Sequence, residues 1–325
     1  MSKRFSVNEQ LKVNLLINFL SKYDKYLMLL IFVAISAFMS NKFFTPENLT
    51  NLLKQNAAIG IVAFGELLVI LTGGIDLSVG AIASLSGIVV ASFLSGGMAW
   101  PLASLLAIGV GGLAGLANGL AVTVAKITPF IVTLATMTIY QGMGLLLSKG
   151  RQVFFKNPDF LKMGREYLIG VPVMAWIWLA IALVVALFLG KTIMGRFIRG
   201  IGGNKEAVRL AGISTIVNET MAYTISGLLC GVAGVVMTSR LTLGTNVMGQ
   251  GWELIAIASV MVGGGNFIGG IGSVGGTVVG VIILGLIGNI MNLLGISIYW
   301  QQIIRGLIIL LAVFSSSRKR QGAVS

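Results

Sequence analysis

Residues 71–80 read LTGGIDLSVG and interrupt an apolar run that continues on both sides of them. Backbone groups without hydrogen-bond partners cannot face lipid, so such a break must be buried in protein or line a water-filled cavity. Asp76 stands where an acidic residue caps a new half-helix, near the positive end of the helix dipole. We therefore interpret the segment as a helix broken beside a pathway through the membrane. The alternative is a cytoplasmic turn in which Asp76 is a solvated cap.

The composition places this break in a membrane protein. The chain has 325 residues, of which 56% are hydrophobic and 10% charged, and its mean hydropathy is +0.95. Soluble globular proteins carry about 25% charged residues, so this chain lacks the polar side chains that would cover a water-facing surface. A helical span takes about 20 residues, so about ten spans with their loops use the whole length. We expect an all-α integral membrane protein in which residues 1–325 form a single transmembrane domain.

Apolar runs along the chain predict the individual spans. They lie near residues 26–40, 56–71, 77–94, 101–124, 129–147, 171–189, 219–238, 253–262, 274–294 and 303–314. This number of spans places both ends of the chain on one side of the membrane. Basic residues collect on cytoplasmic segments. The lysines and arginines before residue 26 and at 318–320 therefore predict that both termini are cytoplasmic.

The net charge of +13, from 23 Lys and Arg against 10 Asp and Glu, is uneven along the chain. In a soluble protein this excess would indicate nucleic-acid binding, whereas here the positive-inside rule explains most of it. The basic connection at residues 191–217 falls on the predicted cytoplasmic side. The connection at 148–170 falls outside, and its basic residues are Lys149, Arg151, Lys156, Lys162 and Arg165. Either the topology is shifted by one crossing or this loop meets an acidic partner. The second is preferred because a shift would misplace the other basic clusters.

Short sequence matches indicate an internal repeat. Ala-Ile-Ala-Ser at residues 81–84 recurs at 256–259, and Val-Gly-Gly at 110–112 recurs at 274–276. The halves run from about residue 56 to 147 and from 218 to 314, with the connection 191–217 between them. An odd number of crossings separates equivalent elements, so the second copy is inverted. Inverted repeats around a site at the midplane are a common transporter design.

Residue content excludes several classes of chemistry. The chain has no histidine and one cysteine, Cys230, which removes histidine-based metal sites and serine–histidine triads. We expect no metal site, and we expect Cys230 to be a small buried packing residue. Residues 270–275 fit the dinucleotide-binding pattern by spacing alone, since no strand precedes them. Residues 190–192 lack the upstream glycine of a P-loop. The chain is therefore not expected to be an enzyme or to hydrolyse ATP.

Glycines spaced four apart predict close contacts between helices. They are Gly111, Gly115 and Gly119, Gly227 and Gly231, and Gly276 and Gly280. Small residues at this spacing let helix backbones approach closely in lipid. For these glycines a structural role is the preferred interpretation.

A short helix is predicted in the cytoplasmic connection. Asn204 is a good N-cap, Glu206 follows in the first turn, and Gly212 suits a C-terminal stop. These signals bound about two turns of helix outside the membrane. From these residues alone, an ordinary solvated loop helix is an equal alternative.

Several stretches, in consistent order, resemble the ribose-type permeases of bacterial sugar ABC importers. They are GGIDLSVG from residue 73, ITPFIVTLATMTI from 127, IGGNKEAVRLAGI from 201, WELIAIASVMVGG from 252 and IGSVGGTVVGVIILG from 271. That family includes ribose, arabinose, xylose and galactose systems, and the similarity covers about residues 41–313. In one departure, Gly73-Gly74 stands where some members have Ser-Gly, which leaves the break intact.

The resemblance implies a subunit of the bacterial inner membrane that dimerises, by default with a second copy of itself. It would receive a monosaccharide from a periplasmic binding protein and be driven by a cytoplasmic ATPase subunit. This chain would bind no cofactor, while the partner subunit uses ATP and Mg²⁺, and no nucleic acid is involved. The basic outer loop would then have the binding protein as its acidic partner. The short helix resembles the family's coupling helix; its residues are Asn204, Lys205, Glu206, Arg209, Leu210 and Gly212.

A neutral sugar needs modest hydrogen-bonding groups along its path. The candidates are Thr72, Asp76, Ser78, Asn118, Thr128, Asn246, Gln250, Glu253, Asn289 and Asn292. The alternative role for each of them is a polar contact between packed helices. A second functional class also stays open, an ion-coupled secondary transporter in which Asp76, Glu66 or Glu253 cycles protons or sodium.

Overall fold

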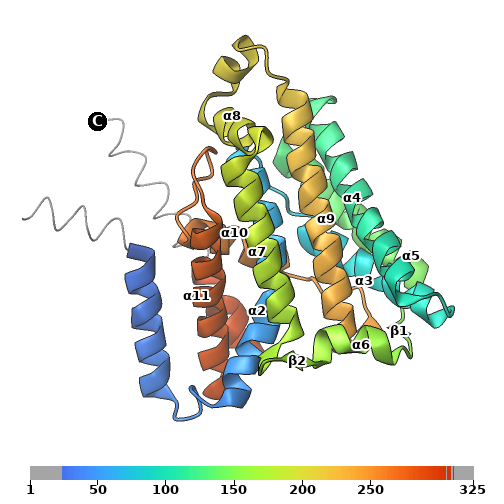
Figure 1. Ribbon diagram of the computed structural model, residues 1–325, viewed down its shortest axis with the longest axis vertical. Helices are drawn as coiled ribbons and strands as arrows, with labels where there is room; N and C mark the ends of the chain where they lie inside the picture. Colours follow the sequence, from blue (N-terminus) through green and yellow to red (C-terminus); the bar gives the residue numbers. More distant parts are fainter. Residues whose placement is uncertain (1–23, 305, 309, 311–325) are drawn as a thin grey trace, which may run out of the picture.

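The computed structural model describes residues 24–304, 306–308 and 310. These residues form a bundle of helices with two short two-stranded antiparallel ribbons (Figure 1). No sheet closes within the described ranges, and the expected helical class is confirmed.

Among the described residues, six helices are long and apolar enough to cross a membrane. They are α2 (Pro46–Leu71), α4 (Trp100–Thr123), α5 (Pro129–Ser148), α7 (Val173–Lys191), α9 (Thr215–Leu241) and α11 (Val274–Leu293). Two shorter apolar helices are α3 (Val79–Ser95) and α10 (Trp252–Val262). Residues 24–39 and 298–304 are also helical. Each of these helices overlaps a run expected from hydropathy, and the last expected run, 303–314, continues beyond the described residues.

The remaining elements lie at the two ends of the bundle. They are α6 (Pro158–Arg165), α8 (Ile193–Leu210), β1 (Val153–Phe154), β2 (Tyr167–Leu168), β3 (Val171–Pro172) and β4 (Leu243–Gly244). Figure 1 shows α6 and the β2–β3 hairpin at one end, the α6 end, and α8 at the other, the α8 end. The connections that carry α6 and α8, expected on opposite sides of the membrane, therefore lie at opposite ends of the bundle.

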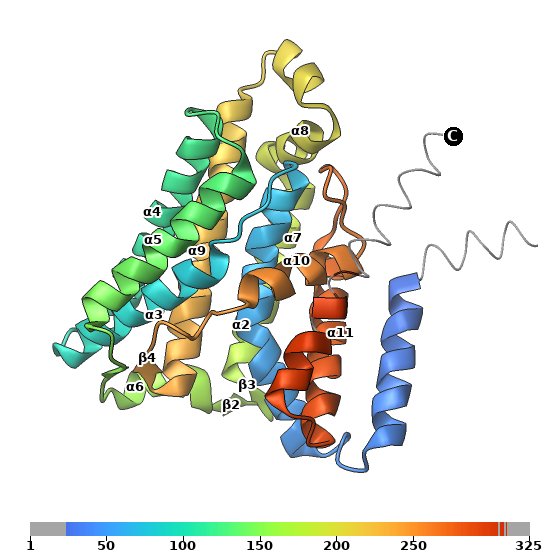
Figure 2. The ribbon, with the colours of Figure 1, turned by 180° about the vertical axis from the view of Figure 1, so that it is seen from behind.

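Both short apolar helices begin inside the bundle after a non-helical stretch. Residues 72–78 connect α2 to α3, and residues 245–251 lead from β4 into α10. Figure 2 shows the first stretch entering from the α8 end and the second from the side of β4. The second stretch meets the first turn of α3 at Gly249 and Gly80, where a Cβ on either glycine would overlap the backbone of the other. The Gly249 N–H also donates to Ser84 Oγ at 2.9 Å.

The carboxylate in the break after α2 is buried, so the alternative in which Asp76 is a solvated cap is wrong. Asp76 is 0% exposed. Ser78, rather than Asp76, occupies the N-cap position of α3. Asp76 lies just before the helix, where its Oδ1 accepts the Ser78 N–H at 2.9 Å and the Ser78 hydroxyl at 2.6 Å.

Helix α9 lies at the centre of the bundle, packed against α2, α3 and most extensively α4. The contact with α4 uses the predicted glycines. A Cβ on Gly115 would lie 3.0 Å from the Gly227 Cα and would overlap the Tyr223 carbonyl oxygen. The expected close packing is confirmed here and between α10 and α11, where Gly280 meets the Ser259 carbonyl. Cys230 on α9 is buried and free, as expected.

Candidate functional site

A cavity of about 810 Å³ opens between α4, α8, α9 and the first broken segment. Its lining includes Thr72 and Gly74 from the break, Lys126 and Thr128 from the α4–α5 connection, and Tyr223 from α9. Ligand-binding pockets commonly measure about 300–1,000 Å³, so this cavity has room for a small solute. It contains two of the predicted path residues, Thr72 and Thr128.

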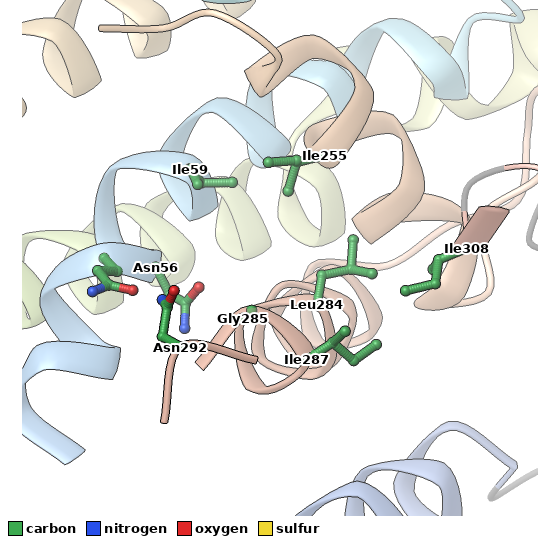
Figure 3. A pocket seen from close by; sticks show the side chains of 10 residues that line it. Asn56, Ile59, Ile255, Leu284, Gly285, Ile287, Asn292 and Ile308 are labelled. Atoms are coloured by element: carbon green, nitrogen blue, oxygen red, sulfur yellow. The ribbon is translucent and has the colours of Figure 1, made fainter. Parts of the chain in front are cut away.

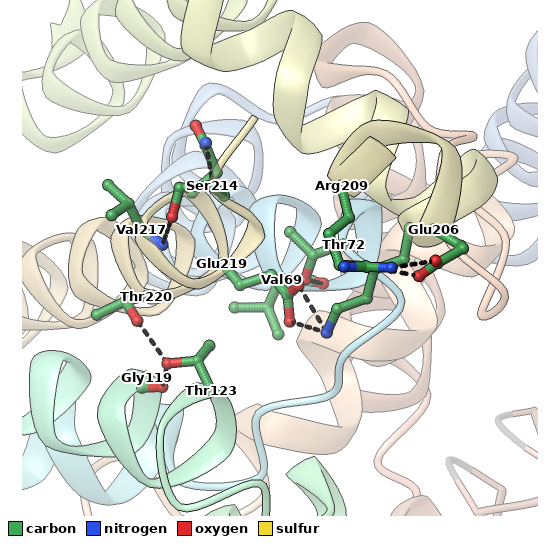
Figure 4. Close-up of polar contacts among 12 residues, drawn as sticks. Val69, Thr72, Gly119, Thr123, Glu206, Arg209, Ser214, Val217, Glu219 and Thr220 are labelled. Atoms are coloured by element: carbon green, nitrogen blue, oxygen red, sulfur yellow. Dashed lines mark hydrogen bonds and ion pairs between the residues drawn. The ribbon is translucent and has the colours of Figure 1, made fainter. Parts of the chain in front are cut away.

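Ion pairs border this cavity at the α8 end (Figure 4). Lys205 Nζ lies 2.8 Å from Oε1 of Glu219, whose side chain is only 8% exposed. Opposite, Thr123 and Thr220 join α4 to α9 through a hydroxyl–hydroxyl hydrogen bond of 2.8 Å. Figure 4 shows both contacts, from α8 to α9 and from α9 to α4. The rim is therefore tied to the helices that enclose the cavity.

The tip of α8 has the predicted helix boundaries. Asn204 has φ −157° and ψ 97° and divides α8, so residues 205–210 form a separate short helix. Asn204 Oδ1 caps this helix by accepting the Ala207 N–H at 2.9 Å. Gly212 follows with φ +77°, a left-handed conformation that glycine adopts without steric cost.

The side chains of the tip face solvent. Arg209 Nη2 lies 2.5 Å from Glu206 Oε1, and both side chains are 63% exposed. The hydrogen bond from Arg209 holds the pKa of Glu206 below its ordinary value, and the same bond raises the pKa of Arg209. Leu210, at the end of the helix, is 74% exposed. The tip therefore presents a fixed charge pair and an uncovered apolar side chain.

A chain of hydrogen bonds crosses the interior below the cavity. Glu66 Oε1 accepts the backbone N–H of Asp76 at 3.2 Å. Asp76 is bonded to Ser78 as described above, and the Ser78 hydroxyl accepts from Asn118 Nδ2 at 2.7 Å. Asn118 Oδ1 in turn accepts the Tyr140 hydroxyl at 3.1 Å. Three predicted path residues, Asp76, Ser78 and Asn118, are thus brought together, but all are 0% exposed. They hold the broken segment in place and do not line the cavity.

Two further buried residues lie beside the broken segment: Tyr223 was not singled out from the sequence, and Glu66 was considered only as an ion-cycling acid of the alternative secondary transporter. Glu66 Oε2 and the Tyr223 hydroxyl are buried and have no hydrogen-bond partner among the described residues. The Tyr223 hydroxyl lies against Gly74 of the broken segment. An acidic residue within an apolar run was the only signal for Glu66, and nothing local distinguished Tyr223.

The remaining path candidates lie elsewhere. Asn246 and Gln250 lie in the second broken stretch, where Gln250 is exposed, and Glu253 lies in the first turn of α10, half-buried against Gly80. Asn289 is 5% exposed and exchanges two hydrogen bonds with Asn48, at 2.7 and 3.1 Å. This contact between α2 and α11 is of the helix-packing kind that was the alternative role of Asn289.

Asn292 borders a separate, smaller cavity. This space of about 80 Å³ lies between α2, α10 and α11 (Figure 3). Asn56 and Ile59 contribute from α2, and Ile255 from α10. Asn292 also accepts a hydrogen bond of 2.9 Å from Gln301 Nε2. The predicted path residues are thus spread over five places and do not form one continuous lining.

The basic residues of the outer connection are all exposed at the α6 end. They are Lys149, Arg151, Lys156, Lys162 and Arg165. Lys162 pairs with Asp159 at 2.9 Å, and this contact raises the pKa of Lys162. Helix α6 is fastened to α9 because Ser239 Oγ donates to the Phe160 carbonyl at 2.6 Å and accepts the Gly164 N–H at 2.9 Å. The positive charges therefore sit on a well-anchored surface.

The amino-acid sequence is similar to those of known proteins over most of its length. Residues 48–313 match the family model described as the permease component of branched-chain amino acid transport systems. The chain is 40% identical to the ribose import permease protein of Bacillus subtilis strain 168, over 92% of this chain and 94% of that protein. It is 37% identical to the D-allose transport system permease protein of Escherichia coli K12, over 91% of each chain. It is 35% identical to the L-arabinose transport system permease protein of the same strain, over 92% of each chain. No solved structure matches the chain.

Proposed function

Since this chain belongs to the family of permease components of branched-chain amino acid transport systems, we propose that it is the membrane subunit of an ATP-driven monosaccharide importer. The substrate is ribose or a related pentose or hexose. The family description refers to amino acids, but relatives aligned over more than nine-tenths of the chain are named for ribose, allose and arabinose. The observation that carries the proposal is the broken helix at 72–78, which enters beside a cavity whose lining includes the hydroxyl groups of Thr72 and Thr128 together with charged side chains at its α8 end.

The chain crosses the inner membrane ten times, with both termini in the cytoplasm. Six long helices, two short helices with their broken stretches, and residues 24–39 and 298–304 account for the crossings. The two broken stretches entering from different ends support inverted halves at about 56–147 and 218–314, as in other transporters. The α8 end is then cytoplasmic and the α6 end periplasmic.

The tip of α8 is the element that docks on the ATPase subunit. Its support is the exposed Glu206–Arg209 pair and the exposed Leu210 at the end of a capped helix. The partner subunit binds and hydrolyses ATP with Mg²⁺, and its closure moves this tip. The cavity of 810 Å³ opens on the same side, so the described conformation delivers substrate to the cytoplasm.

The sugar is held weakly along the path. Thr72 and Thr128 offer neutral hydroxyl groups in the cavity, which suit a neutral, hydroxyl-rich solute without trapping it. Strong affinity belongs to the periplasmic binding protein, since a tight membrane site would slow release. That protein meets the basic surface of the α6 end, which favours an acidic face on the partner.

A second copy of the chain completes the pathway. The polar residues described above are spread over five places, so no single continuous path through one chain is lined by them. Exposed apolar side chains cover α4, α5 and α7, and part of this surface is available to a partner as well as to lipid.

The test is uptake into proteoliposomes that contain the chain, its ATPase subunit and its binding protein. Ribose, allose, arabinose, xylose and galactose are compared with leucine, with and without ATP inside. We expect ATP-dependent uptake of one or more sugars and none of leucine. Uptake driven by a sodium or proton gradient without ATP or partners would instead establish a secondary transporter. ATP-dependent leucine uptake would overturn the sugar assignment alone.

A further inference from the structure

Three segments that are distant in sequence meet where α2 ends. They are the end of α2 at Leu71, the first half of α8 at Gly202, and the α10–α11 connection at Gly269 and Gly270. The Gly270 N–H donates to the Leu71 carbonyl at 2.9 Å. This carbonyl lies in the last turn of α2, where helices leave carbonyls without internal partners. A neighbouring segment therefore completes the hydrogen bonding of α2 at the point where the helix breaks.

Glycine at position 202 is what allows this meeting. A Cβ on Gly202 would overlap both the Leu71 carbonyl oxygen and the Gly270 nitrogen. A Cβ on Gly269 would lie 2.6 Å from the Gly202 Cα and 2.8 Å from the Gly73 nitrogen. Real side chains do not reach such distances from backbone atoms, and backbone cannot rotate away as a flexible side chain does. We name these four residues, Gly73, Gly202, Gly269 and Gly270, the glycine junction.

A second contact ties α8 to the same connection. Arg199, one turn before Gly202, donates from Nη1 to the carbonyl of Gly272 at 2.8 Å. Hydrogen bonds from a charged donor contribute more than neutral ones, about 1.5–3 kcal/mol. The first half of α8 is thus attached by the junction and by Arg199, and its exposed tip follows directly after Asn204.

We propose that the glycine junction and Arg199 transmit movement of the α8 tip to the broken segment and to the α10–α11 connection together. This inference rests on the proposed docking of the tip on an ATPase subunit. Gly73 begins the broken segment, which leads to α3, while Gly269 and Gly270 lie between α10 and α11. The junction therefore contacts the segment that leads into α3 and the segment that follows α10, and α3 and α10 are the two interrupted helices. Gly202 also borders the cavity of 810 Å³, and in this scheme Gly202 and Arg199 act as positioning residues through the backbone contacts described above.

The alternative is that the junction only packs the fold. Packing alone predicts that a substitution lowers stability, assembly and transport in parallel. Transmission predicts that a substituted complex still assembles and hydrolyses ATP but imports less sugar for each ATP. The two outcomes differ in the ratio of ATP hydrolysed to sugar imported.

The experiment compares Gly202→Ala with Gly203→Ala in the complete transporter. The control is matched, because both variants add a methyl group and helix propensity at adjacent positions of α8. A Cβ on Gly203 meets nothing within 4 Å. We expect Gly202→Ala to assemble with its partners and hydrolyse ATP, while sugar uptake per ATP falls about tenfold, within the usual range of coupling effects. Gly203→Ala should match the wild type.

Arg199→Ala provides a test that adds no volume. It removes the bond to Gly272 without a clash, so we expect assembly to be kept and uptake per ATP to fall, with Arg199→Lys recovering part of the loss. Normal coupling in both Gly202→Ala and Arg199→Ala would overturn the proposal. A loss of thermal stability that accounts for the loss of uptake in both would also overturn it, in favour of packing. If the wild-type complex itself shows no ATP-dependent uptake, the proposed function fails.

Discussion

At the scale of single residues, the two buried carboxyl groups, those of Glu66 and Asp76, are costly to accommodate inside the fold. Glu66 and Asp76 are both 0% exposed, and no ion pair joins either to a lysine or arginine within the described part of the chain. Two uncompensated negative charges inside a membrane domain are costly. Asp76 receives two hydrogen bonds from Ser78 at the start of α3, whereas Glu66 receives one. We therefore expect Asp76 to carry the charge and Glu66 to be neutral.

This assignment predicts that Glu66→Gln is tolerated and Glu66→Ala is not. Glutamine is neutral, has nearly the same size and still offers an oxygen to the Asp76 N–H. Alanine leaves that N–H without its buried acceptor, which costs about 1–3 kcal/mol, in addition to the cavity. Thermal unfolding of the purified protein should show a near-normal Tm for glutamine and a clear decrease for alanine. Equal destabilisation by the two variants would show that an ionised Glu66 is required.

At the scale of elements, α9 depends on glycine contacts for its central place. A Cβ on Gly227 would lie 2.8 Å from the Gly115 Cα and would overlap the Gly111 carbonyl oxygen. Because the obstructing atoms are backbone, a methyl group there forces α4 and α9 apart. Overpacking of this kind costs about 1–3 kcal/mol.

We expect Gly227→Ala to lower the Tm of the protein by several degrees. The matched control is Gly142→Ala on α5, where a Cβ meets nothing within 4 Å. This second variant should unfold at the wild-type temperature or slightly above it, because alanine favours helix. An unchanged Tm for Gly227→Ala would mean that α4 and α9 are not held by this contact.

Substitutions in the α8 tip are expected to reduce transport without lowering the stability of the protein. Exposed ion pairs contribute little to stability, so reversing Glu206 or Arg209 should leave the Tm unchanged while reducing sugar uptake. The double variant Glu206→Arg, Arg209→Glu restores the pair within the helix but presents inverted charges to the ATPase subunit, so its uptake should stay low. Normal uptake by the double variant would refute the assignment of this tip as the docking element.

The charge state of the tip also has an expected pH dependence. Arg209 lowers the pKa of Glu206, so the stabilisation that this pair adds is present at neutral pH and is lost only as the pH falls through the lowered folded pKa. Uptake should therefore show no step from Glu206 at pH values of about 6 to 8. A transition in that range that disappears in Glu206→Gln would contradict the observed pairing.

At the scale of the whole molecule, the position of each loop at one end of the bundle or the other predicts whether it is accessible from the periplasm or from the cytoplasm. Lys156 is exposed at the α6 end and Ala211 at the α8 end. The chain suits cysteine labelling because its one natural cysteine, Cys230, is fully buried. A membrane-impermeant maleimide applied from the periplasmic side should label Lys156→Cys at once and Ala211→Cys only after permeabilisation. The wild type is the unlabelled control, and the opposite order would invert the proposed topology.

Features that depend on residues close in sequence were predictable, and features that depend on residues distant in sequence were less so. The cap of the α8 tip was predictable because Asn204 and Ala207 are three residues apart, and such contacts follow from residue type and spacing. The path residues were less predictable because their neighbours come from elsewhere in the chain. The amide partner of Asn289 is Asn48, which lies 241 positions away in the chain.

The helical membrane class, the positions of most spans, the break at 71–80 and the α8 tip can all be predicted from the order of the amino acids. Hydropathy, glycine spacing and capping act over a few residues, so they are readable in one dimension. Only the tertiary structure decided what surrounds the break. It placed Glu66, Ser78 and Asn118 around Asp76, and it set Gly202 against the end of α2. Those contacts join helices that are distant in sequence, and their partners are chosen by packing that no local pattern records.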